Sequence, residues 1–276
     1  MKETDCKTKY PLLLVHGMGF RDHKLLNYWG RIPSRLEAHG AQVFYGWQDS
    51  VGSTEQNAKT VLKNLDRALE LSGAEKVNII AHSKGGLEAR LIAGKMGQAH
   101  KIASISTINT PHNGSLTVDA LMKLPRLLVR FAGACTSLWM RILGDRTPDA
   151  YACFNEFTTA HAERFNAENP VPQDVLCQSF AFKMKSAASD LTMLIPYLVV
   201  KHFDGESDGL LNVRAVKWAD FRGVYTSSGR RGISHPDQVD IRRMRFTRKP
   251  PQNDHEISDI CDFYLRLVSE LREKGL

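Results

Sequence analysis

The chain opens with short apolar runs that alternate with longer stretches in which apolar residues recur at helical spacing. The short runs are typical of buried strands, and the longer stretches are typical of helices that pack on one side. Runs of the first kind lie at 10–15, 41–45, 77–81 and 101–108, and stretches of the second kind at 27–39 and 53–72. Strands that alternate with helices predict an α/β fold, with a mostly parallel, doubly wound sheet and helices on both faces.

The alternation stops between residues 115 and 172. Apolar side chains still recur there at helical spacing, but Pro125, Gly133 and Gly144 divide the segment into short helices. So long an insertion after a core strand is typical of a cap or lid over a binding site. The same pattern also fits an ordinary helical layer on the sheet. We predict one domain, 1–276, with a helical lid insertion at 115–172.

The remaining third of the chain returns to the sheet and ends in a helix. Strand patterns return at 175–183 and 221–226, an apolar stretch predicted to be irregular covers 190–200, and an acid-rich turn covers 203–211. Apolar residues at helical spacing over 256–274 predict a closing helix, which Asn253 or Asp254 would cap. The sheet therefore gains strands after the insertion.

The most distinctive stretch is KVNIIAHSKGGLEAR, at 76–90, which joins a predicted strand to a predicted helix. Ser83 lies at the junction, between Ala81 and Gly85. This spacing is the G-x-S-x-G nucleophile elbow with alanine at the first position, and it holds the serine in a strained turn where strand and helix pass closely. A glycine-rich turn without chemistry or a phosphate cradle are the alternatives, although G-x-x-x-x-G-K-[ST] is absent from the stretch. The context favours Ser83 as a nucleophile.

A serine nucleophile needs a base and an acid, which follow it along the chain in such folds. His235 lies in a loop after the last predicted strand, whereas His255 falls in the first turn of the closing helix, so we predict His235 as the base. Among Asp204, Glu206 and Asp208, only Asp208 stands at a bend before apolar residues, and we predict that it orients the imidazole. An ordinary Asp-Gly turn is the alternative.

A His-Gly pair follows the first predicted strand, at His16 and Gly17. In hydrolases with a nucleophile elbow, such a loop supplies one backbone N–H to the oxyanion hole, and glycine lets the backbone approach a substrate oxygen. We predict that Met18 donates this N–H and that Lys84, directly after the serine, donates the second. The elbow therefore has a predicted oxyanion hole beside it.

Composition limits the remaining possibilities. The five cysteines are an odd number without C-x-x-C spacing, which argues against a disulfide framework and a zinc site. The N-terminal apolar run is too short for a secretion signal, and the apolar segment at 191–200 is half the length of a membrane span. We expect a cytoplasmic chain without a transmembrane segment, or a secreted one whose signal has been removed.

The net charge of +7 comes largely from Arg230, Arg231 and the run at 241–249. The run predicts a solvated basic loop, and attraction to anionic lipid or acidic substrate is the alternative. No helix, ribbon or aromatic platform accompanies it, which argues against nucleic acid as a partner.

Taken together, these motifs resemble the bacterial true lipases of the α/β-hydrolase fold, in particular those of Pseudomonas and Burkholderia. The resemblance covers nearly the whole chain and rests on His16-Gly17-Met18, Tyr28-Trp29-Gly30-Arg31-Ile32-Pro33, Gly40-Ala41-Gln42-Val43, Leu71-Ser72-Gly73, KVNIIAHSKGG, Thr110-Pro111-His112-Asn113-Gly114-Ser115, Ser207-Asp208-Gly209-Leu210 and His235-Pro236-Asp237-Gln238-Val239-Asp240. It implies the α/β-hydrolase fold, with nucleophile, acid and base at Ser83, Asp208 and His235. Its oxyanion donors fall on Met18 and Lys84.

The resemblance also implies a structural Ca²⁺ near the histidine loop. Its carboxylate ligands would be Asp190 and Asp237, with backbone carbonyls near Ile241 and Arg245, a set that suits a hard cation. Three arginines could pair with Asp237 instead: Arg242, Arg243 and Arg245. The chain departs from the family at Lys84, where relatives carry His or Gln, and in lacking their secretion signal and paired cysteines.

We therefore expect a lipase-like carboxylic-ester hydrolase that forms an acyl-enzyme on lipophilic, acylglycerol-type esters. The chemistry requires no cofactor, and the lid would make transient contact with a lipid surface. An acyltransferase or thioesterase with the same three residues is the alternative within enzymes. A non-catalytic lipid-binding protein on the same scaffold is the alternative outside them.

Overall fold

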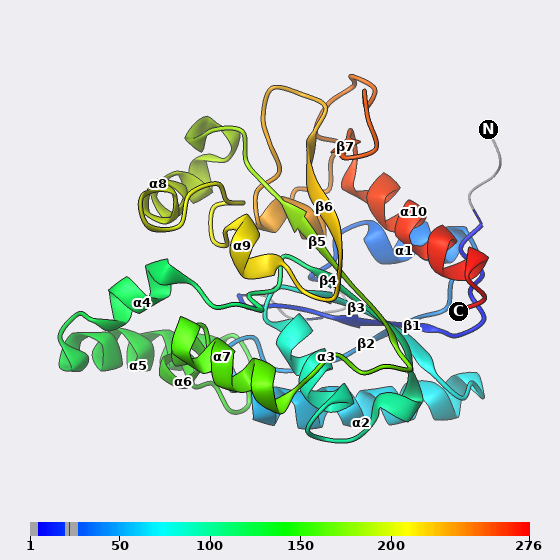
Figure 1. The fold of residues 1–276 in the computed structure, drawn as a ribbon, viewed down its shortest axis with the longest axis horizontal. Helices are drawn as coiled ribbons and strands as arrows, with labels where there is room; N and C mark the ends of the chain where they lie inside the picture. The colour runs from blue at the N-terminus through cyan, green and yellow to red at the C-terminus, as the bar shows by residue number, and fades with distance from the viewer. Residues whose placement is uncertain (1–4, 20–21, 23–26) are drawn as a thin grey trace.

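A computed structural model describes residues 5–19, 22 and 27–276 of the chain (Figure 1). A seven-stranded sheet runs through it in the order β2-β1-β3-β4-β5-β6-β7, and every neighbouring pair is parallel. The strands are β1 (Leu12–Val15), β2 (Val43–Tyr45), β3 (Val77–His82), β4 (Ile102–Ile108), β5 (Leu176–Phe182), β6 (Asp220–Ser227) and β7 (Glu256–Ile257). The predicted parallel, doubly wound sheet is confirmed.

Helices cover both faces of this sheet. Successive residues of β1 point to opposite faces: Leu12 and Leu14 pack with α1 (Ile32–Ala38) and α10 (Ile260–Glu273), while Leu13 and Val15 pack with α2 (Thr54–Ser72) and α3 (Gly85–Ala93). Full burial of each such side chain contributes about 1.5–3 kcal/mol. The two clusters explain why β1 is apolar on both faces.

The insertion at 115–172 divides into two parts. It holds α4 (Leu116–Met122), α5 (Arg126–Ile142), α6 (Ala150–Asn155) and α7 (Thr159–Glu168). Cys153 of α6 and Phe165 of α7 belong to the same core cluster as α2 and α3. By contrast, Gly133 is the only buried residue among the 17 of α5. The second part of the insertion is therefore a helical layer on the sheet, and α5 is the part that suits a lid.

Two segments differ from the predictions: the stretch at 190–200 and the start of the closing helix. The stretch at 190–200, predicted to be irregular, forms a 3₁₀ turn (Leu191–Met193) and then α8 (Leu194–Phe203). Pro196 lies in the first turn of α8, where a missing N–H breaks no intrahelical bond. The short helix α9 (Val213–Val216) follows. All these helices lie at the carboxyl ends of the strands.

The closing helix also begins later than predicted. Residues 256 and 257 form β7, which pairs with β6, and α10 starts at Ile260 with Asp259 as its cap rather than Asn253 or Asp254. The sequence could not reveal β7, because a strand of two residues shows no pattern of its own and is defined only by its pairing with β6. Across the described ranges, no helix combines the length and the apolar character needed to cross a membrane.

Candidate active site

Ser83 occupies a tight turn between β3 and α3. Its φ of 54° lies in the left-handed region, which side-chain-bearing residues seldom adopt, so the turn is strained as the elbow pattern predicts. A Cβ added at Gly85 would lie 2.5 Å from the carbonyl oxygens of Val15 and His16, and one at Gly86 would lie 2.1 Å from Thr110 Oγ1. Only glycine fits at these two positions, because the elbow presses against β1 and the end of β4.

The His-Gly loop passes directly beside the serine. A Cβ added at Gly17 would lie 2.6 Å from the Cβ of Ser83. Met18 follows on this loop, half-buried, and the Cys153 thiol lies 3.6 Å from its sulfur. On the other side, Lys84 caps α3, and its backbone N–H donates no hydrogen bond within the described residues. The two predicted oxyanion donors thus flank Ser83 from separate elements.

Asp208 and His235 form a close buried pair. The Nδ1 of His235 lies 2.6 Å from Oδ2 of Asp208, and the backbone N–H of His235 donates to the carbonyl oxygen of Asp208 at 2.9 Å. Asp208 is fully buried, and 8% of the His235 surface is exposed to solvent. His82, which precedes the serine, lies against the same imidazole, with ring centroids 4.5 Å apart. The fold therefore brings Ser83 and the predicted acid–base pair into one place.

Asp208 is held by more than the histidine. Its Oδ2 also accepts from Asn109 Nδ2 at 2.5 Å and from Gln238 Nε2 at 2.7 Å, and its Oδ1 accepts from the backbone N–H groups of Leu210 and Leu211 at 2.9 and 2.8 Å. Burial raises the pKa of this carboxyl, but His235 and the backbone donors outweigh burial and lower it below its usual value. The group is therefore an oriented carboxylate.

A second polar chain backs the elbow. Tyr28 Oη lies 2.7 Å from Nδ1 of His82, and Nε2 of His82 lies 3.1 Å from Oε1 of Gln238. Burial lowers the pKa of His82 well below its usual value, so this imidazole is neutral. Sequence reasoning missed Tyr28, Gln238 and Asn109 as members of the site, although Asn109 follows β4 and Gln238 follows the predicted base by three positions. Polar residues at such strand ends were the available signal.

The hydroxyl of Ser83 makes no hydrogen bond to His235 within the described residues. A serine and its base need to approach within about 2.6–3.2 Å for proton transfer, and this contact is often looser without substrate. The carbonyl oxygen of Ser83 is fixed instead, since it accepts from Thr110 Oγ1 at 2.7 Å. The backbone of Ser83 is thus anchored, whereas its hydroxyl makes no hydrogen bond within the described residues.

Lys84 carries a second, unusual feature. Its ammonium group pairs with Glu88 one turn along α3, and both side chains are only 1% exposed. Burial lowers the pKa of the Lys84 amine, but the Glu88 carboxylate outweighs burial and raises it. Asn57 Nδ2 donates to the same Glu88 oxygen at 2.8 Å. The residue after Ser83 is therefore held in place through its side chain.

The carboxylates that the resemblance assigns to calcium already face arginines. Arg242 Nη2 lies 2.7 Å from Oδ1 of Asp190, and Arg231 Nη2 lies 2.5 Å from Oδ2 of Asp237. A Ca²⁺ ion takes six to eight oxygen ligands at about 2.3–2.6 Å and cannot share these oxygens with guanidinium groups. The residues present do not fit the ion.

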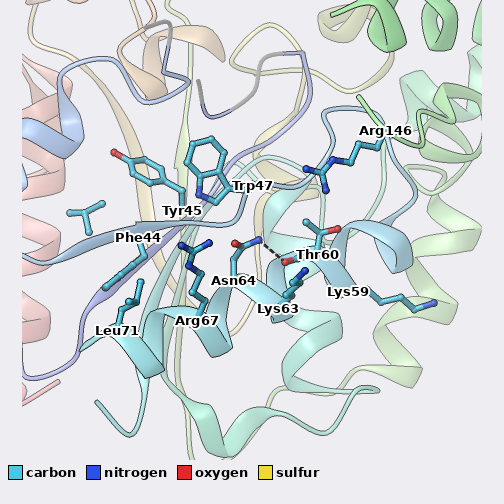
Figure 2. A pocket seen from close by; sticks show the side chains of 11 residues that line it. Phe44, Tyr45, Trp47, Lys59, Thr60, Lys63, Asn64, Arg67, Leu71 and Arg146 are labelled. Carbon is cyan, nitrogen blue, oxygen red and sulfur yellow. Dashed lines mark hydrogen bonds between the residues drawn. The ribbon is translucent and has the colours of Figure 1, made fainter. Parts of the chain in front are cut away.

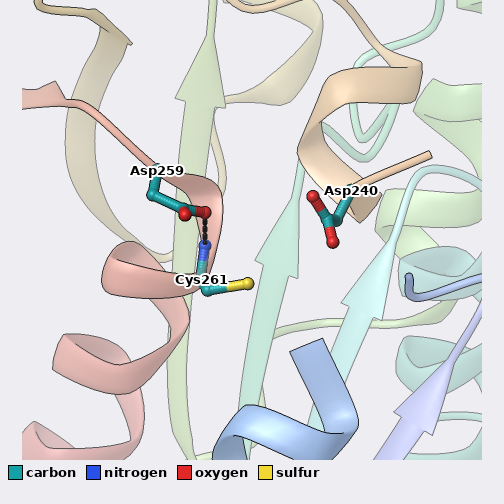
Figure 3. A group of neighbouring side chains, drawn as sticks. All are labelled: Asp240, Asp259 and Cys261. Atoms are coloured by element: carbon teal, nitrogen blue, oxygen red, sulfur yellow. Dashed lines mark hydrogen bonds between the residues drawn. The ribbon is translucent and has the colours of Figure 1, made fainter. Parts of the chain in front are cut away.

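A second acidic cluster also fails to fit a metal. Oxygen atoms of Asp240 and Asp259 and the sulfur of Cys261 lie within 4.8 Å of one another (Figure 3). Arg31 fills the space, with Nε 2.8 Å from Asp240 and Nη2 3.0 Å from Asp259. Burial raises the pKa of the Cys261 thiol to about 12, so it carries no charge. The cluster is an ion-pair network that ties α1 to α10.

Exposed apolar side chains gather on the helices that follow β4 and β5. Figure 1 shows α4, α5 and α8 on one side of the molecule, with the C-terminal end of α10 on the other. Their exposed apolar residues are Leu116, Leu121, Leu127, Leu128, Phe131, Leu138, Trp139, Ile142, Ile195, Leu198 and Phe203. Asp204, which caps the end of α8, links this helix to α4 and α9, because its carboxylate accepts from the backbone N–H of Thr117 at 2.8 Å and from Asn212 Nδ2 at 3.1 Å. A surface this apolar is typical of a binding site.

The parallel sheet, the strained serine elbow and the Asp208–His235 pair after later strands define the α/β-hydrolase fold, as expected from the sequence. The sequence profile described as palmitoyl protein thioesterase matches residues 11–165, more than half of the chain. The chain belongs to the palmitoyl protein thioesterase family.

Relatives by sequence carry the name of lipases. The chain is 31% identical over 182 residues to a triacylglycerol lipase of Pseudarthrobacter phenanthrenivorans (61% of this chain, 56% of the relative) and to one of Burkholderia plantarii (61% and 50%). It is 26% identical over 262 residues to triacylglycerol lipase 2 of Saccharomyces cerevisiae (91% and 74%). The chain spans about half the length of the two bacterial relatives. The resemblance to bacterial lipases is confirmed.

Solved structures agree on the fold. The lipase of Staphylococcus hyicus matches with a TM-score of 0.69 and 15% identity, over 97% of each chain. A metagenomic carboxyl esterase matches with a TM-score of 0.70 and 16% identity, over 97% of this chain and 76% of that one. At such identities the match speaks for the α/β-hydrolase fold alone.

Proposed function

We propose that the chain is a serine hydrolase that cleaves lipophilic carboxylic esters through an acyl-enzyme. The observation that carries the proposal is the convergence of a strained Ser83, the 2.6 Å contact between Asp208 and His235, and the Gly17 loop at one place. Strain at a buried serine is costly and is typical of functional sites. A purely structural turn would need neither a neighbouring imidazole nor an oriented carboxylate.

The steps follow from these positions. Ser83 Oγ attacks the ester carbonyl carbon while His235 Nε2 takes the hydroxyl proton, and the backbone N–H groups of Met18 and Lys84 bind the oxyanion. His235 then returns the proton to the leaving alcohol, which leaves an acyl group on the serine. Water repeats the cycle with His235 as base and releases the carboxylic acid. Asp208 keeps Nδ1 protonated and stabilises the imidazolium throughout.

The apolar surface of α5 and α8 supports a lipophilic substrate. We assign a lid to the insertion at 115–172 of a single domain at 1–276, with α5 as its moving part and α6 and α7 as the layer that stays on the sheet. Leu127 is 83% exposed and Phe131 is 68% exposed, so closure over a substrate or contact with a lipid surface would remove both from water. No cofactor enters the chemistry, and calcium has no place in it.

A thioester substrate is the second candidate, because the family profile is that of palmitoyl protein thioesterases. The same serine, base and oxyanion hole would cleave an acyl thioester, with a thiol rather than an alcohol as leaving group. Transfer of the acyl group to an alcohol or thiol acceptor is the further variant. Comparing acyl esters with acyl thioesters of equal chain length, with and without an acceptor, separates these activities.

The test is a single substitution. Ser83→Ala should lower kcat for a p-nitrophenyl ester series by about 10⁶-fold, because the other residues cannot act without the nucleophile. Ser34→Ala, an exposed serine on α1, is the matched control and should leave the rate unchanged. Circular dichroism should report the same fold for both variants. Activity that persists in Ser83→Ala would contradict the proposal, and inactivity of the wild type on every ester and thioester would favour a non-catalytic lipid-binding protein.

A further inference from the structure

We propose that an arginine clasp, formed by Arg242 and Arg231, replaces the calcium ion in this chain and makes its histidine loop independent of calcium. The inference rests on the proposed function, since the loop carries the base His235. Arg242 and Arg231 act as positioning residues. Within the described residues their side chains make ion pairs with Asp190 and Asp237 and none with Asp208.

The clasp joins two buried carboxylates that lie far apart in the sequence. Asp190 lies after β5 and Asp237 lies two residues after His235, and each side chain is at most 2% exposed. Arg242 reaches both, with Nη2 2.7 Å from Asp190 and Nε 3.6 Å from Asp237. Arg231 adds the 2.5 Å contact to the other oxygen of Asp237. Two guanidinium groups thus meet two carboxylates, and the charges balance.

Three of the four carboxylate oxygens already accept hydrogen bonds, and the fourth, Oδ1 of Asp237, lies 3.6 Å from Arg242 Nε. Oδ1 of Asp190 also accepts from the backbone N–H and hydroxyl of Thr192 at 3.0 and 2.7 Å, and its Oδ2 accepts from Ser234 Oγ at 2.6 Å. Oδ2 of Asp237 also accepts from the Ser234 backbone N–H at 3.2 Å. A divalent ion would have to displace these donors and sit beside two positive groups, which repel it.

The clasp acts on the base through the chain. Ser234, which bonds to both carboxylates, directly precedes His235, so the two aspartates fix the backbone from which the imidazole projects. Arg242 and Arg231 are about one third exposed or less, and they close the carboxylates from the solvent side. A guanidinium group carries one positive charge and can replace a metal ion here, because Arg binds carboxylates in a fixed geometry.

The experiment compares the wild type with Arg231→Ala/Arg242→Ala in EDTA and in millimolar CaCl₂. We expect wild-type kcat and Tm to be equal in both buffers. The double variant should lose on the order of 10²-fold in kcat in EDTA, the loss typical of a misplaced catalytic group, and its Tm should fall. Calcium should restore part of both, because the two carboxylates are then available as ligands. Arg248→Ala, an exposed arginine without an ion pair in the described residues, is the control and should behave as wild type.

Two outcomes would overturn the clasp. One is a wild type whose Tm falls in EDTA or which binds calcium in titration calorimetry. The other is a double variant with wild-type Tm and kcat in EDTA. Tm and calcium binding do not depend on the substrate, so they test the clasp even if the proposed hydrolase activity fails.

We infer separately that a cationic groove between β2 and α2 binds a phosphate-bearing anion. The groove has a volume of about 700 Å³, within the range of small-ligand sites (Figure 2). Four of the described residues that line it are basic and none is acidic: Lys59, Lys63, Arg67 and Arg146. Ser83 is not among its lining residues, so the groove is a site of its own.

The basic side chains of the groove repel one another. Lys59, Lys63 and Arg67 follow one another four residues apart on α2, and like charges at this spacing destabilise a helix. Only Lys59 has an acidic partner, Glu55 at 3.1 Å; Lys63, Arg67 and Arg146 make no ion pair within the described residues. Arg146 comes from the loop after α5 and faces the same space (Figure 2). A bound anion would neutralise this arrangement.

An aromatic wall completes the groove. Trp47 is 43% exposed and has a φ of 56°, so its backbone is strained in the left-handed region while its indole faces outward. Its ring lies edge-on to Tyr45, with centroids 5.8 Å apart. Arginine forks and lysines bind phosphate oxygens, and the aromatic rings offer a face for an attached organic group. A phosphate ester, free or in a lipid headgroup, fits this chemistry.

The test measures binding of pyrophosphate by calorimetry, and of phosphatidic acid vesicles by sedimentation, at about 0.15 M salt to screen weak contacts. Lys63→Gln/Arg67→Gln should weaken binding about tenfold or more, because charge-assisted hydrogen bonds are lost. Arg35→Gln/Lys274→Gln changes the net charge equally on exposed residues elsewhere and should bind as wild type. Pyrophosphate binding alone would indicate a free phosphate, and vesicle binding alone a headgroup. Equal weakening in both variants, or no binding of either probe, would overturn the inference.

Discussion

The cluster around Asp208 and the surface of α5 are opposites. Asp208 is fully buried, and its carboxylate accepts hydrogen bonds from five donors on three segments of the chain. Nearly all of α5 lies in contact with water, including Leu127 and Phe131. A buried network whose polar groups are all hydrogen-bonded fixes one geometry. An apolar helix in water gains free energy when another surface covers it. The comparison places a rigid polar network and an uncovered apolar helix in separate parts of the molecule.

The largest effect should come from breaking the rigid side. Asp208→Asn puts an amide opposite Nδ1 of His235 and beside the donors Asn109 and Gln238, so it favours the wrong tautomer of the imidazole. We expect kcat for a soluble ester to fall by about 10⁴-fold. Asp174→Asn, an exposed aspartate, is the control. A loss below tenfold would show that Asp208 does not orient the base.

The second effect concerns the buried Lys84–Glu88 pair next to Ser83. Lys84→Met removes the partner of Glu88 and leaves a buried carboxylate without a countercharge, so the free energy of unfolding should fall by about 3–5 kcal/mol. Lys84→Met/Glu88→Leu should recover most of that loss in urea denaturation. If the double variant were as unstable as the single one, packing rather than charge would explain the effect.

Much of this arrangement was predictable from the sequence, and the reason is local. β1 is apolar on both faces and β3 nearly so, and the elbow needs small residues at fixed offsets from Ser83, so both are visible in a short stretch. The order of Ser83, Asp208 and His235 also follows from the chain alone. Their catalytic roles stay predictions until activity is measured.

The support of the site was not predictable, because it depends on contacts across the fold. Asn109 and Gln238 meet Asp208 only after three separate strand ends come together. Tyr28 reaches His82 from a segment far away in sequence. The helix α8 was mistaken for an irregular segment because its 3₁₀ entry and Pro196 hide the helical period. Local pattern reveals elements, but not which polar side chains meet.

The third prediction concerns pH. Burial lowers the pKa of His82 and of His112 well below the unfolded value near 6.5, so the unfolded chain binds more protons as the pH falls below that value. The free energy of unfolding should be level above about pH 7 and fall below 6.5 by up to about 1.4 kcal/mol per pH unit for each histidine. Urea titrations across this range should show the slope. His112→Asn should reduce it, and an unchanged slope would exclude His112 as a source.

The smallest effect on stability should come from the adaptable side. Leu127→Ser/Phe131→Ser alters only exposed positions, so the free energy of unfolding should change by about 0.5 kcal/mol or less. Hydrolysis of emulsified long-chain esters should fall severalfold, while hydrolysis of a dissolved short ester should not change. Arg126→Ser, exposed at the start of the same helix, is the control. Equal loss on both substrates would show that α5 is not a lid or lipid contact.

The most direct test of the account is covalent labelling by a fluorophosphonate, followed by mass spectrometry of the labelled peptide. An activated serine at the elbow predicts a single adduct on Ser83, formed rapidly in the wild type and slowly in His235→Gln. An adduct on another serine, or no adduct on a folded chain, would contradict the claim that Ser83, His235 and Asp208 form a working nucleophile.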